Sequence, residues 1–306
     1  MQKSVVTIGN FDGVHAAHRH LFRCVLEAAS ENGLRAVVLT FDPHPAHVVA
    51  PEKAPRLLTT MEERCGLIRA AGIEEIVVLP FEAEIACLSP REFAERVLTG
   101  RLAAAIVIVG ENFRFGHRQT GDTTTLHELG RELGFETRII SSVKRRGQVV
   151  SSSSVRRFIE AGKVTMAARF LERPHSLSGD VVPGEGIGAK QTVPTLNLET
   201  RAQVLPARGV YITQTRDLDD SRRWNSITNV GYRPTFNGHA LSIETFLLEP
   251  LTGSSPRHIQ VEFCRRVRDE RKFDSADELK AQILRDVGRA QTFFHRMARA
   301  TKSNRK

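Results

Sequence analysis

The chain contains few cysteines and no long apolar run. Its four cysteines form no Cys-x-x-Cys pair and show no metal-ligand spacing, so we expect buried thiols rather than a metal centre. The longest apolar runs, such as residues 103–109, have the length of a strand and are far too short to cross a membrane. No charged segment followed by an apolar stretch opens the chain. We therefore expect a cytoplasmic protein without a membrane partner.

Length and charge narrow the class of protein. The 306 residues exceed the usual size of one domain, and 41% hydrophobic with 26% charged residues is typical of a globular protein. We therefore expect two domains. The net charge of +9 favours anionic partners such as nucleotides or nucleic acids. Part of this excess lies at 144–146 and near the C-terminus, where a hairpin turn and a frayed tail explain it, so nucleic acid is an alternative partner and not the expected one.

The first half of the sequence alternates between strand and helix patterns. Near-continuous apolar runs predict strands at 5–8, 36–41, 76–79, 105–109 and 137–140. Helices are expected between them, and Thr60 and Ser89 have the pattern of N-caps with a glutamate three residues later. This alternation predicts a parallel sheet covered on both faces. Ligands of such sheets bind beyond the carboxyl ends of the strands, so segments 9–18 and 110–116 should face one cleft.

The second half changes character after about residue 161. Residues 172–179 indicate a connector, and short β-rich runs follow at 210–213, 227–230, 241–247 and 259–263. Turns of glycine, proline and polar residues separate them, a pattern that favours an antiparallel barrel or a sandwich. A long helix then starts after the cap Ser275. Its buried stripe should consist of Leu279, Ile283, Val287, Ala290 and Phe294.

The segment Gly9–His18 carries the clearest chemical signal. Gly9 and Gly13 permit a sharp turn between the first strand and the next helix. His15 and His18 then lie at the mouth of that helix, where free N–H groups and the helix dipole attract phosphate. A metal pair or packing histidines are alternatives, although no third ligand is nearby. Donors aimed at an α-phosphate would stabilise nucleotidyl transfer, so we favour a phosphate site.

Two further segments point to phosphate. The hydroxyls of Ser152-Ser153-Ser154 either cap a helix or donate to phosphate oxygens, and Arg156 can add a charged fork. In the second half, the glycine-rich run 184–188 precedes Thr195 and Asn197, which share one face of an extended segment. These groups suit phosphate or Mg²⁺. Taken alone, this second stretch is equally explained as a flexible loop and a strand edge.

The segment Gly9–His18 resembles the N-terminal signature of bacterial bifunctional riboflavin kinase/FAD synthetases, whose second activity is FMN adenylyltransferase. Further matches in the first half follow in the same order at 40–45, 110–116, 121–122 and 151–156. Matches to the kinase half follow at 184–197, 209–211, 229–236 and Glu244. The resemblance implies a Rossmann-like α/β domain of the HxGH nucleotidyltransferase type over 1–172. It also implies a small antiparallel β-barrel riboflavin kinase domain with a C-terminal helix over 176–302.

The resemblance also implies roles for individual residues of the first domain. His15 and His18 would be catalytic and would polarise the phosphates of ATP. Asn112 and Arg114 would bind the flavin. The residues that bind ATP there would be Gly9, Asn10, Phe11, Asp12, Ser152, Ser153 and Arg156.

In the second domain, the same resemblance assigns Mg²⁺ and ATP to Thr195 and Asn197. Glu244 would take the proton from the riboflavin 5′-hydroxyl, although it also fits a solvent-facing position in an alternating strand. Further ATP-binding residues would be Gly186, Gly188 and Lys190. The implied activities are ATP-dependent phosphorylation of riboflavin to FMN and adenylylation of FMN to FAD, with Mg²⁺ as cofactor.

The chain departs from the family pattern at several positions. Ala17 stands where the family usually has glycine, and its methyl group can crowd a phosphate. Lys190 replaces an arginine and lacks its planar fork. Residues 191–193 differ from the usual Leu-Gly-Phe, and a usual Tyr-Gly is missing from 249–257. The alternatives are therefore a monofunctional member with one inactive half, or a non-enzymatic nucleotide- or RNA-binding protein.

Overall fold

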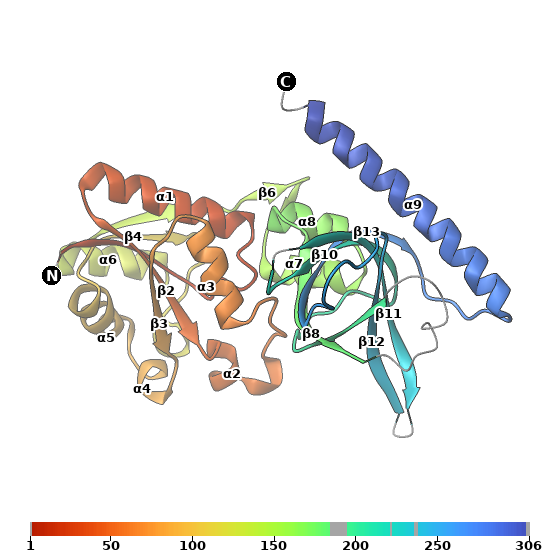
Figure 1. The fold of residues 1–306 in the computed structure, drawn as a ribbon. Coiled ribbons are helices and arrows are strands. Elements are labelled where there is room, and N and C mark those ends of the chain that lie inside the picture. Colours follow the sequence, from red (N-terminus) through yellow and green to blue (C-terminus); the bar gives the residue numbers. More distant parts are fainter. Residues whose placement is uncertain (1, 184–194, 221, 236–237, 304–306) are drawn as a thin grey trace. The chain divides into compact units, whose positions relative to one another are not determined.

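The computed structural model describes residues 2–183, 195–220, 222–235 and 238–303, and its contacts divide the chain into units 1–154 and 155–306 (Figure 1). Helices α7 (Ser152–Glu160) and α8 (Val164–Leu171) lie almost wholly within the second unit. The domain limits 1–172 and 176–302 stay predictions. Within the described ranges, no helix combines the length and the apolar character that a membrane span needs.

The first unit is built on a five-stranded sheet in which every neighbouring pair is parallel. All five runs predicted as strands lie in it, in the order β3-β2-β1-β4-β5. The central strand is buried at every position, as expected for a sheet covered on both faces. The strands are β1 (Ser4–Ile8), β2 (Arg35–Asp42), β3 (Glu75–Pro80), β4 (Ala104–Gly110) and β5 (Glu136–Ile140).

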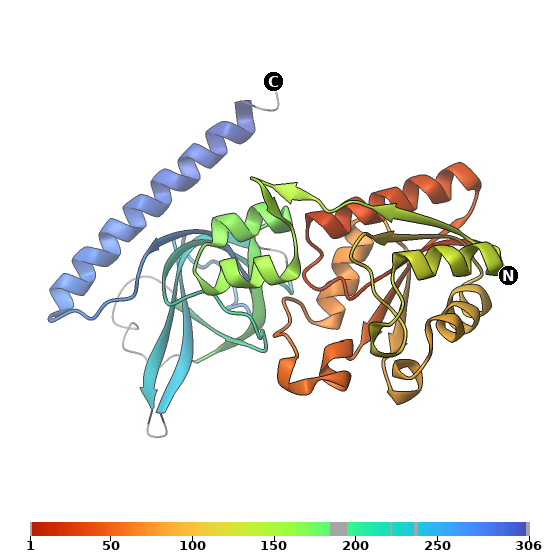
Figure 2. The same ribbon diagram turned by 180° about the vertical axis from the view of Figure 1, so that it is seen from behind.

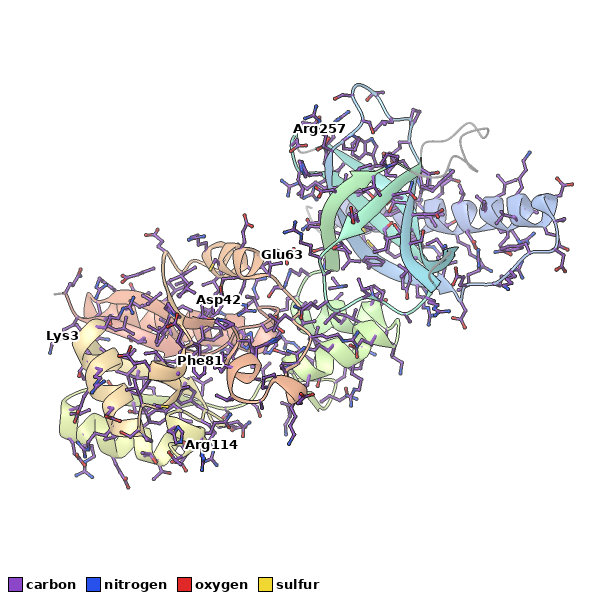
Figure 3. All side chains as sticks on the ribbon, turned by 90° about the horizontal axis from the view of Figure 1, so that it is seen from below. Lys3, Asp42, Glu63, Phe81, Arg114 and Arg257 are labelled. Carbon is purple, nitrogen blue, oxygen red and sulfur yellow. The ribbon has the colours of Figure 1, made fainter. Side chains whose placement is uncertain are left out.

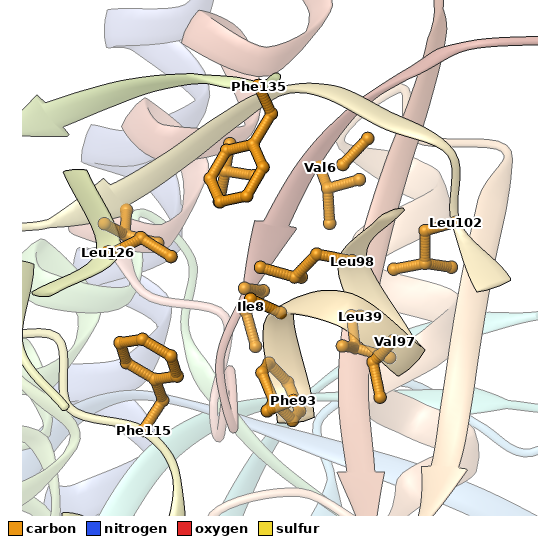
Figure 4. Packing of buried hydrophobic residues seen from close by; sticks show 14 of the residues in the cluster. Val6, Ile8, Leu39, Phe93, Val97, Leu98, Leu102, Phe115, Leu126 and Phe135 are labelled. Atoms are coloured by element: carbon orange, nitrogen blue, oxygen red, sulfur yellow. The ribbon is translucent and has the colours of Figure 1, made fainter. Parts of the chain in front are cut away.

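Helices form a separate core on each face of this sheet. On one face, Val6 and Ile8 pack with residues of α5, α6 and the π-helical turn Ala94–Arg101 (Figure 4). On the other face, Val5 packs with residues of α1 and α3. The predicted caps Thr60 and Ser89 are confirmed, since each forms a capping box. The helices are α1 (Ala16–Asn32), α2 (Pro45–Val49), α3 (Met61–Ala70), α4 (Ala83–Ala86), α5 (Pro90–Phe93) and α6 (Thr123–Leu133).

Short elements complete this unit. Strands β6 (Lys144–Arg145) and β7 (Gln148–Val149) pair as a hairpin, which confirms the predicted turn at the basic cluster. Single 3₁₀ turns lie at Pro51–Lys53 and His117–Gln119.

The second unit is a closed antiparallel barrel, which decides between the barrel and the sandwich. Its strand order is β10-β11-β12-β9-β8-β13. Apolar side chains such as Tyr211 and Phe263 fill the interior. Thr213 and Thr228 are fully buried there, and their hydroxyls bond to each other at 2.8 Å. The strands are β8 (His175–Val182), β9 (Thr195–Thr200), β10 (Gly209–Asp217), β11 (Arg223–Thr235), β12 (Gly238–Leu247) and β13 (His258–Arg268).

The last helix, α9 (Ala276–Ser303), lies along the outside of the barrel (Figure 2). Ala290 and Phe294 pack against outward-facing side chains of β10 and β11, as the predicted stripe requires. The prediction is wrong for Leu279, which is 42% exposed. The first half of the helix buries Asp286 instead, whose carboxylate accepts a hydrogen bond from Nε of Arg268 at 2.8 Å. A polar contact therefore replaces apolar packing there.

The cysteines are less buried than expected. All four are free thiols; Cys24, Cys65 and Cys264 are half-buried, and Cys87 is exposed at the end of the short helix α4. The prediction of buried thiols is therefore wrong for Cys87. Burial raises the pKa of Cys264 to about 12, so this group stays a thiol. Among the described residues, no three or more His, Cys, Asp or Glu side chains are grouped so that they could hold a metal ion.

Candidate active sites

The loop between β1 and α1 has a rare backbone conformation. Phe11 and Val14 adopt φ values of 47° and 39°, in the left-handed region. Such values are unusual for any residue with a side chain, and most of all for β-branched valine. Gly13 has a φ of 80°, and its N–H donates to the hydroxyl of Thr59 at 3.2 Å. The segment before α3 therefore holds the loop in place.

Asp12 joins the loop to the protein interior. Its carboxylate is 2% exposed and accepts hydrogen bonds from the N–H groups of Leu58 and Thr59, at 3.0 and 3.2 Å. Nη2 of Arg64 lies 3.6 Å from Oδ1 of Asp12, and Arg64 is only 1% exposed. The Asp12 side chain thus positions the loop, and contact of Asp12 with ATP stays a prediction. Arg64 was not expected here, although it lies four residues before the buried Ile68 of α3.

His15 and His18 form a stacked pair at the N-terminus of α1. Their ring centroids are 3.6 Å apart and the rings are inclined by 19°. His15 caps the helix, because its Nδ1 accepts the backbone N–H of His18 at 3.4 Å. A neutral His15 therefore carries its proton on Nε2. The ring of Phe11 meets His18 edge-on at 5.1 Å. The structure thus brings these three predicted residues together.

The surroundings of His18 favour its neutral form. Burial lowers the pKa of His18 well below its usual value, and positive charge on His15 and Arg64 lowers it further. Its Nδ1 is buried and has no hydrogen-bond partner in the described part of the chain. A neutral imidazole offers one N–H donor at the mouth of the helix, where backbone N–H groups already favour an anion.

The serine segment reaches the same loop from far along the chain. The hydroxyl of Ser152 donates to the backbone carbonyl of Asp12 at 2.9 Å. Ser151 caps α7 by accepting the N–H of Ser154 at 3.2 Å. Ser153 is exposed, and Arg156 is half-buried one turn further along the helix. Ser152 is therefore placed at the loop, whereas phosphate contacts of Ser153 and Arg156 stay predictions.

His44 joins this region without having been expected there. Its Nε2 lies 3.0 Å from Nδ2 of Asn10, and its Nδ1 accepts the N–H of Ala46 at the start of α2. The signal was its position in the matched segment 40–45, directly after β2. Gly9 leaves room for the ring of Phe11, because a Cβ at Gly9 would lie 3.0 Å from that ring. Asn10 and Gly9 therefore lie in one packed loop.

Asn112 and Arg114 follow β4, the neighbour of β1 in the sheet. The two strands are parallel, so both loops leave the same edge of the sheet, as predicted. Both side chains are exposed, and Arg114 is labelled in Figure 3. Nη1 of Arg114 lies 3.5 Å from Oδ2 of Asp122, the cap of α6. Flavin binding by Asn112 and Arg114 stays a prediction.

The barrel places a row of polar residues across three strands. Glu244 of β12 pairs directly with Asn197 of β9 on one side and with Asn229 of β11 on the other. The residues that flank Glu244 and Asn197 in their strands, such as Ile243 and Leu196, fill the barrel core. The row therefore lies on the outer face. Its members come from widely separated parts of the sequence, and only the strand register brings them together.

Glu244 is half-buried, and its Oε1 accepts a hydrogen bond from the hydroxyl of Ser242 at 2.9 Å. This environment differs from that of a freely solvated strand residue. Glu270 was not expected at this site; a Cβ at Gly231 would lie 2.2 Å from its Oε1. Thr195 is exposed at the start of β9. The predicted residues Gly186, Gly188 and Lys190 lie outside the described residues.

Known proteins resemble this chain along almost its whole length. Residues 1–154 match the FAD synthetase family and residues 171–294 match the riboflavin kinase family. A solved structure from Streptococcus pneumoniae, described as a macrolide-efflux protein, is 28% identical with a TM-score of 0.86, covering 95% of this chain and 94% of that one.

Two relatives named bifunctional riboflavin kinase/FMN adenylyltransferase align over most of both chains. The protein from Escherichia coli K12 is 35% identical over 290 residues, which cover 95% of this chain and 92% of the relative. The protein from Haemophilus influenzae is 30% identical over 295 residues, which cover 96% of each chain. The chain therefore belongs to the bifunctional riboflavin kinase/FMN adenylyltransferase family.

Proposed function

We propose that this protein phosphorylates riboflavin to FMN and adenylylates FMN to FAD, with ATP as co-substrate in both reactions. The observation that carries the proposal is that the two family matches fall on different parts of the chain, one on the parallel sheet and one on the barrel. Each part has its own polar cluster, at His15 and His18 and at Asn197 and Glu244. The relatives carry both activities in their names.

In the kinase reaction, the oxygen of the riboflavin 5′-hydroxyl attacks the γ-phosphorus of ATP. The bond from that phosphorus to the β–γ bridging oxygen breaks, and ADP leaves. The hydroxyl proton passes to the carboxylate of Glu244, which acts as general base. Two observations support this role: the strand pairs on both sides hold the backbone of Glu244, and the hydroxyl of Ser242 donates to Oε1 of its carboxylate.

Mg²⁺ fits the oxygen donors of β9 beside Glu244. The hydroxyl of Thr195 and the amide oxygen of Asn197 are oxygen ligands, which Mg²⁺ prefers. Mg²⁺ usually takes few ligands from the protein and the rest from phosphate and water, so a site with few carboxylates suits it. When bound, the ion would neutralise phosphate charge. Thr195 and Asn197 would hold it beside the nucleotide.

In the adenylyl transfer, an oxygen of the FMN phosphate attacks the α-phosphorus of ATP. The bond to the α–β bridging oxygen breaks, and pyrophosphate leaves. This nucleophile is already an anion, so the step needs no general base. His15 and His18 then serve as N–H donors to the phosphate oxygens, together with the N-terminus of α1. The lowered pKa of His18 is consistent with this role, because the neutral ring offers one N–H donor and does not have to act as an acid.

The finer assignments belong to the same proposal. Residues 1–172 carry the adenylyl transfer and residues 176–302 the phosphorylation. Gly9, Asn10, Ser152, Ser153 and Arg156 contact ATP in the first reaction, and Asn112 and Arg114 contact FMN. The protein acts in the cytoplasm, with neither nucleic acid nor a membrane as partner.

Two separate assays test the halves independently. Riboflavin with Mg-ATP reports the kinase, and FMN with Mg-ATP reports the adenylyltransferase, with the flavins separated by chromatography. We expect FMN from the first assay and FAD from the second. FMN without FAD would support the monofunctional alternative, which Ala17 motivates, and would contradict the adenylyl transfer. No turnover in either assay, with tight and salt-sensitive RNA binding, would support the non-enzymatic alternative.

A further inference from the structure

A basic groove lies between α9 and the outer face of the barrel, away from the proposed kinase site on β9 and β12. Strands β10 and β13 form its barrel side, and they lie across the barrel from β9 and β12. Its volume is about 700 Å³, within the range of small-molecule sites. We call it the arginine groove. Its charged wall consists of Arg265, Arg266, Arg285, Arg289 and Arg296.

The charge of the arginine groove is only partly balanced by acidic side chains. None of the residues that line it, all within the described part of the chain, is acidic. The charge of Arg266 is matched by Asp269 at 3.0 Å, and Arg285 donates to the side chain of Gln282. In the described residues, however, neither Arg265 nor Arg296 forms an ion pair with a carboxylate. Uncompensated guanidinium groups that converge on one groove favour an anion there.

The guanidinium group of Arg289 is only weakly paired and is therefore almost as free to bind an anion as those of Arg265 and Arg296. Its Nη1 lies 4.0 Å from the carboxylate of Asp286, which Nε of Arg268 already approaches to 2.8 Å. Arg285, Arg289 and Arg296 recur at helical spacing and share one face of α9. Their planar forks match phosphate oxygens better than single point charges do. The helix thus presents a row of phosphate-binding groups to the groove.

The floor of the groove is apolar. Ile212, which is 3% exposed, and Val267 line it from the barrel, and Phe293 lines it from α9. Phe293 is half-buried, so part of its ring remains accessible. Gly288 also lines the groove, and a Cβ there would meet no atom of the described residues within 4 Å. A glycine inside a helix weakens it, and no close contact in the described part of the chain requires one here. The glycine keeps the floor open.

We propose that the arginine groove is a second binding site for a flat aromatic phosphate ester, the chemical class of FMN, FAD and ATP. Phosphate oxygens bind Arg265, Arg289 and Arg296, and the aromatic ring lies on the apolar floor beside Phe293. Binding in the groove does not depend on catalysis, so it can be tested whether or not either reaction proceeds. A flavin nucleotide and an adenine nucleotide both belong to this chemical class, and the test shows which of the two binds.

The test counts ligand bound to the full chain by equilibrium dialysis. FMN, ATP, riboflavin and inorganic pyrophosphate are the probes, each measured alone so that no reaction occurs. We expect the double variant R289A/R296A to lose one equivalent of FMN or of ATP relative to the unmodified protein. Riboflavin has the same ring as FMN but no phosphate, and its bound amount should not change. Pyrophosphate should bind the groove at least about tenfold more weakly than the preferred nucleotide, because it lacks the ring.

Two further variants separate the groove from general charge. Arg299→Ala removes an arginine of α9 that does not line the groove. This variant should still bind the equivalent of nucleotide that R289A/R296A loses. Gly288→Leu fills the floor without changing charge, and it should lose that equivalent. The rate of riboflavin phosphorylation should be unchanged in all of these variants, which confirms that they fold. Equal stoichiometry in the unmodified protein and R289A/R296A would overturn the proposal. Loss of the same equivalent in Arg299→Ala would also overturn it. So would binding of a short single-stranded RNA to the groove that FMN cannot displace.

Discussion

Nδ1 of His15 accepts the backbone N–H of His18, and the two imidazoles stack with their centroids 3.6 Å apart. The hydrogen bond leaves Nε2 of His15 as the nitrogen that can donate, and burial lowers the pKa of His18 so that its ring stays neutral. A neutral His18 therefore lies stacked on His15 at the mouth of α1. This arrangement suits stabilisation of phosphate charge better than proton abstraction.

The first prediction concerns His18. His18→Ala should lower the rate of FAD formation from FMN by about 10²- to 10³-fold, because one donor to the phosphate oxygens is lost. The rate of FMN formation from riboflavin should not change. His18→Gln provides the matched control, since its amide retains a neutral N–H donor and should restore part of the rate. Equal rates for the alanine and glutamine variants would show that donation by this side chain does not matter.

The second prediction concerns the Asp12–Arg64 pair. Arg64→Met removes a cation from beside the buried carboxylate of Asp12 and should destabilise the first unit by up to about 3–5 kcal/mol. Thermal unfolding measures this loss. The double variant Asp12→Asn with Arg64→Met should recover part of it, because the buried negative charge is gone as well. Additive losses in the double variant would contradict energetic linkage between the two side chains.

The third prediction concerns Glu244. Glu244→Gln keeps the shape of the side chain but cannot accept a proton, so FMN formation should fall by about 10²- to 10⁴-fold. FAD formation from added FMN should remain. Glu199→Gln is the matched control, because Glu199 lies on β9 two residues after Asn197 and is exposed. If Glu199→Gln lowers the kinase rate as much as Glu244→Gln, a specific role for Glu244 is excluded.

The fourth prediction concerns pH and His175. Burial lowers the pKa of His175 to about 4, and the positive charge of Arg173 contributes. In the unfolded chain the pKa is close to the usual 6.5, so the unfolded state binds a proton first as pH falls. The free energy of unfolding is therefore unaffected by titration of this group above pH 6.5. It falls as the pH drops from about 6.5 to 4, by up to about 3 kcal/mol.

Calorimetry across this pH range checks the effect. His175→Gln removes the titrating group, so the unfolding temperature of the second unit should fall less steeply below pH 6.5 in this variant. Parallel pH profiles for the variant and the unmodified protein would contradict the assignment to His175.

The sequence predicted local features, such as helix caps and strands, better than it predicted contacts between residues far apart in the chain. The caps Thr60 and Ser89 and the five parallel strands follow from local patterns of polarity, and the structure confirms them. The barrel follows from short β runs and turns, although the closed form required the pairings. The register that sets Glu244 beside Asn197 joins strands far apart in sequence, so only the family resemblance gave an order for these residues.

Residues whose roles depend on distant contacts were missed. Arg64 looks like an ordinary helix residue until Asp12 is found beside it. Glu270 lies in a connection after β13, and its approach to Gly231 has no local signal. Leu279 fits the apolar stripe of α9 by spacing, yet buried polar contacts take its place on the barrel. Tertiary packing decides such positions, and spacing alone does not contain it.

A time course of the full protein with riboflavin and Mg-ATP tests the central claim most directly. Samples are quenched at intervals and their flavins separated by chromatography. We predict that FMN appears first and that FAD follows as FMN is consumed, with ADP and pyrophosphate as co-products. FMN that accumulates without any FAD, or the absence of FMN altogether, would contradict the account.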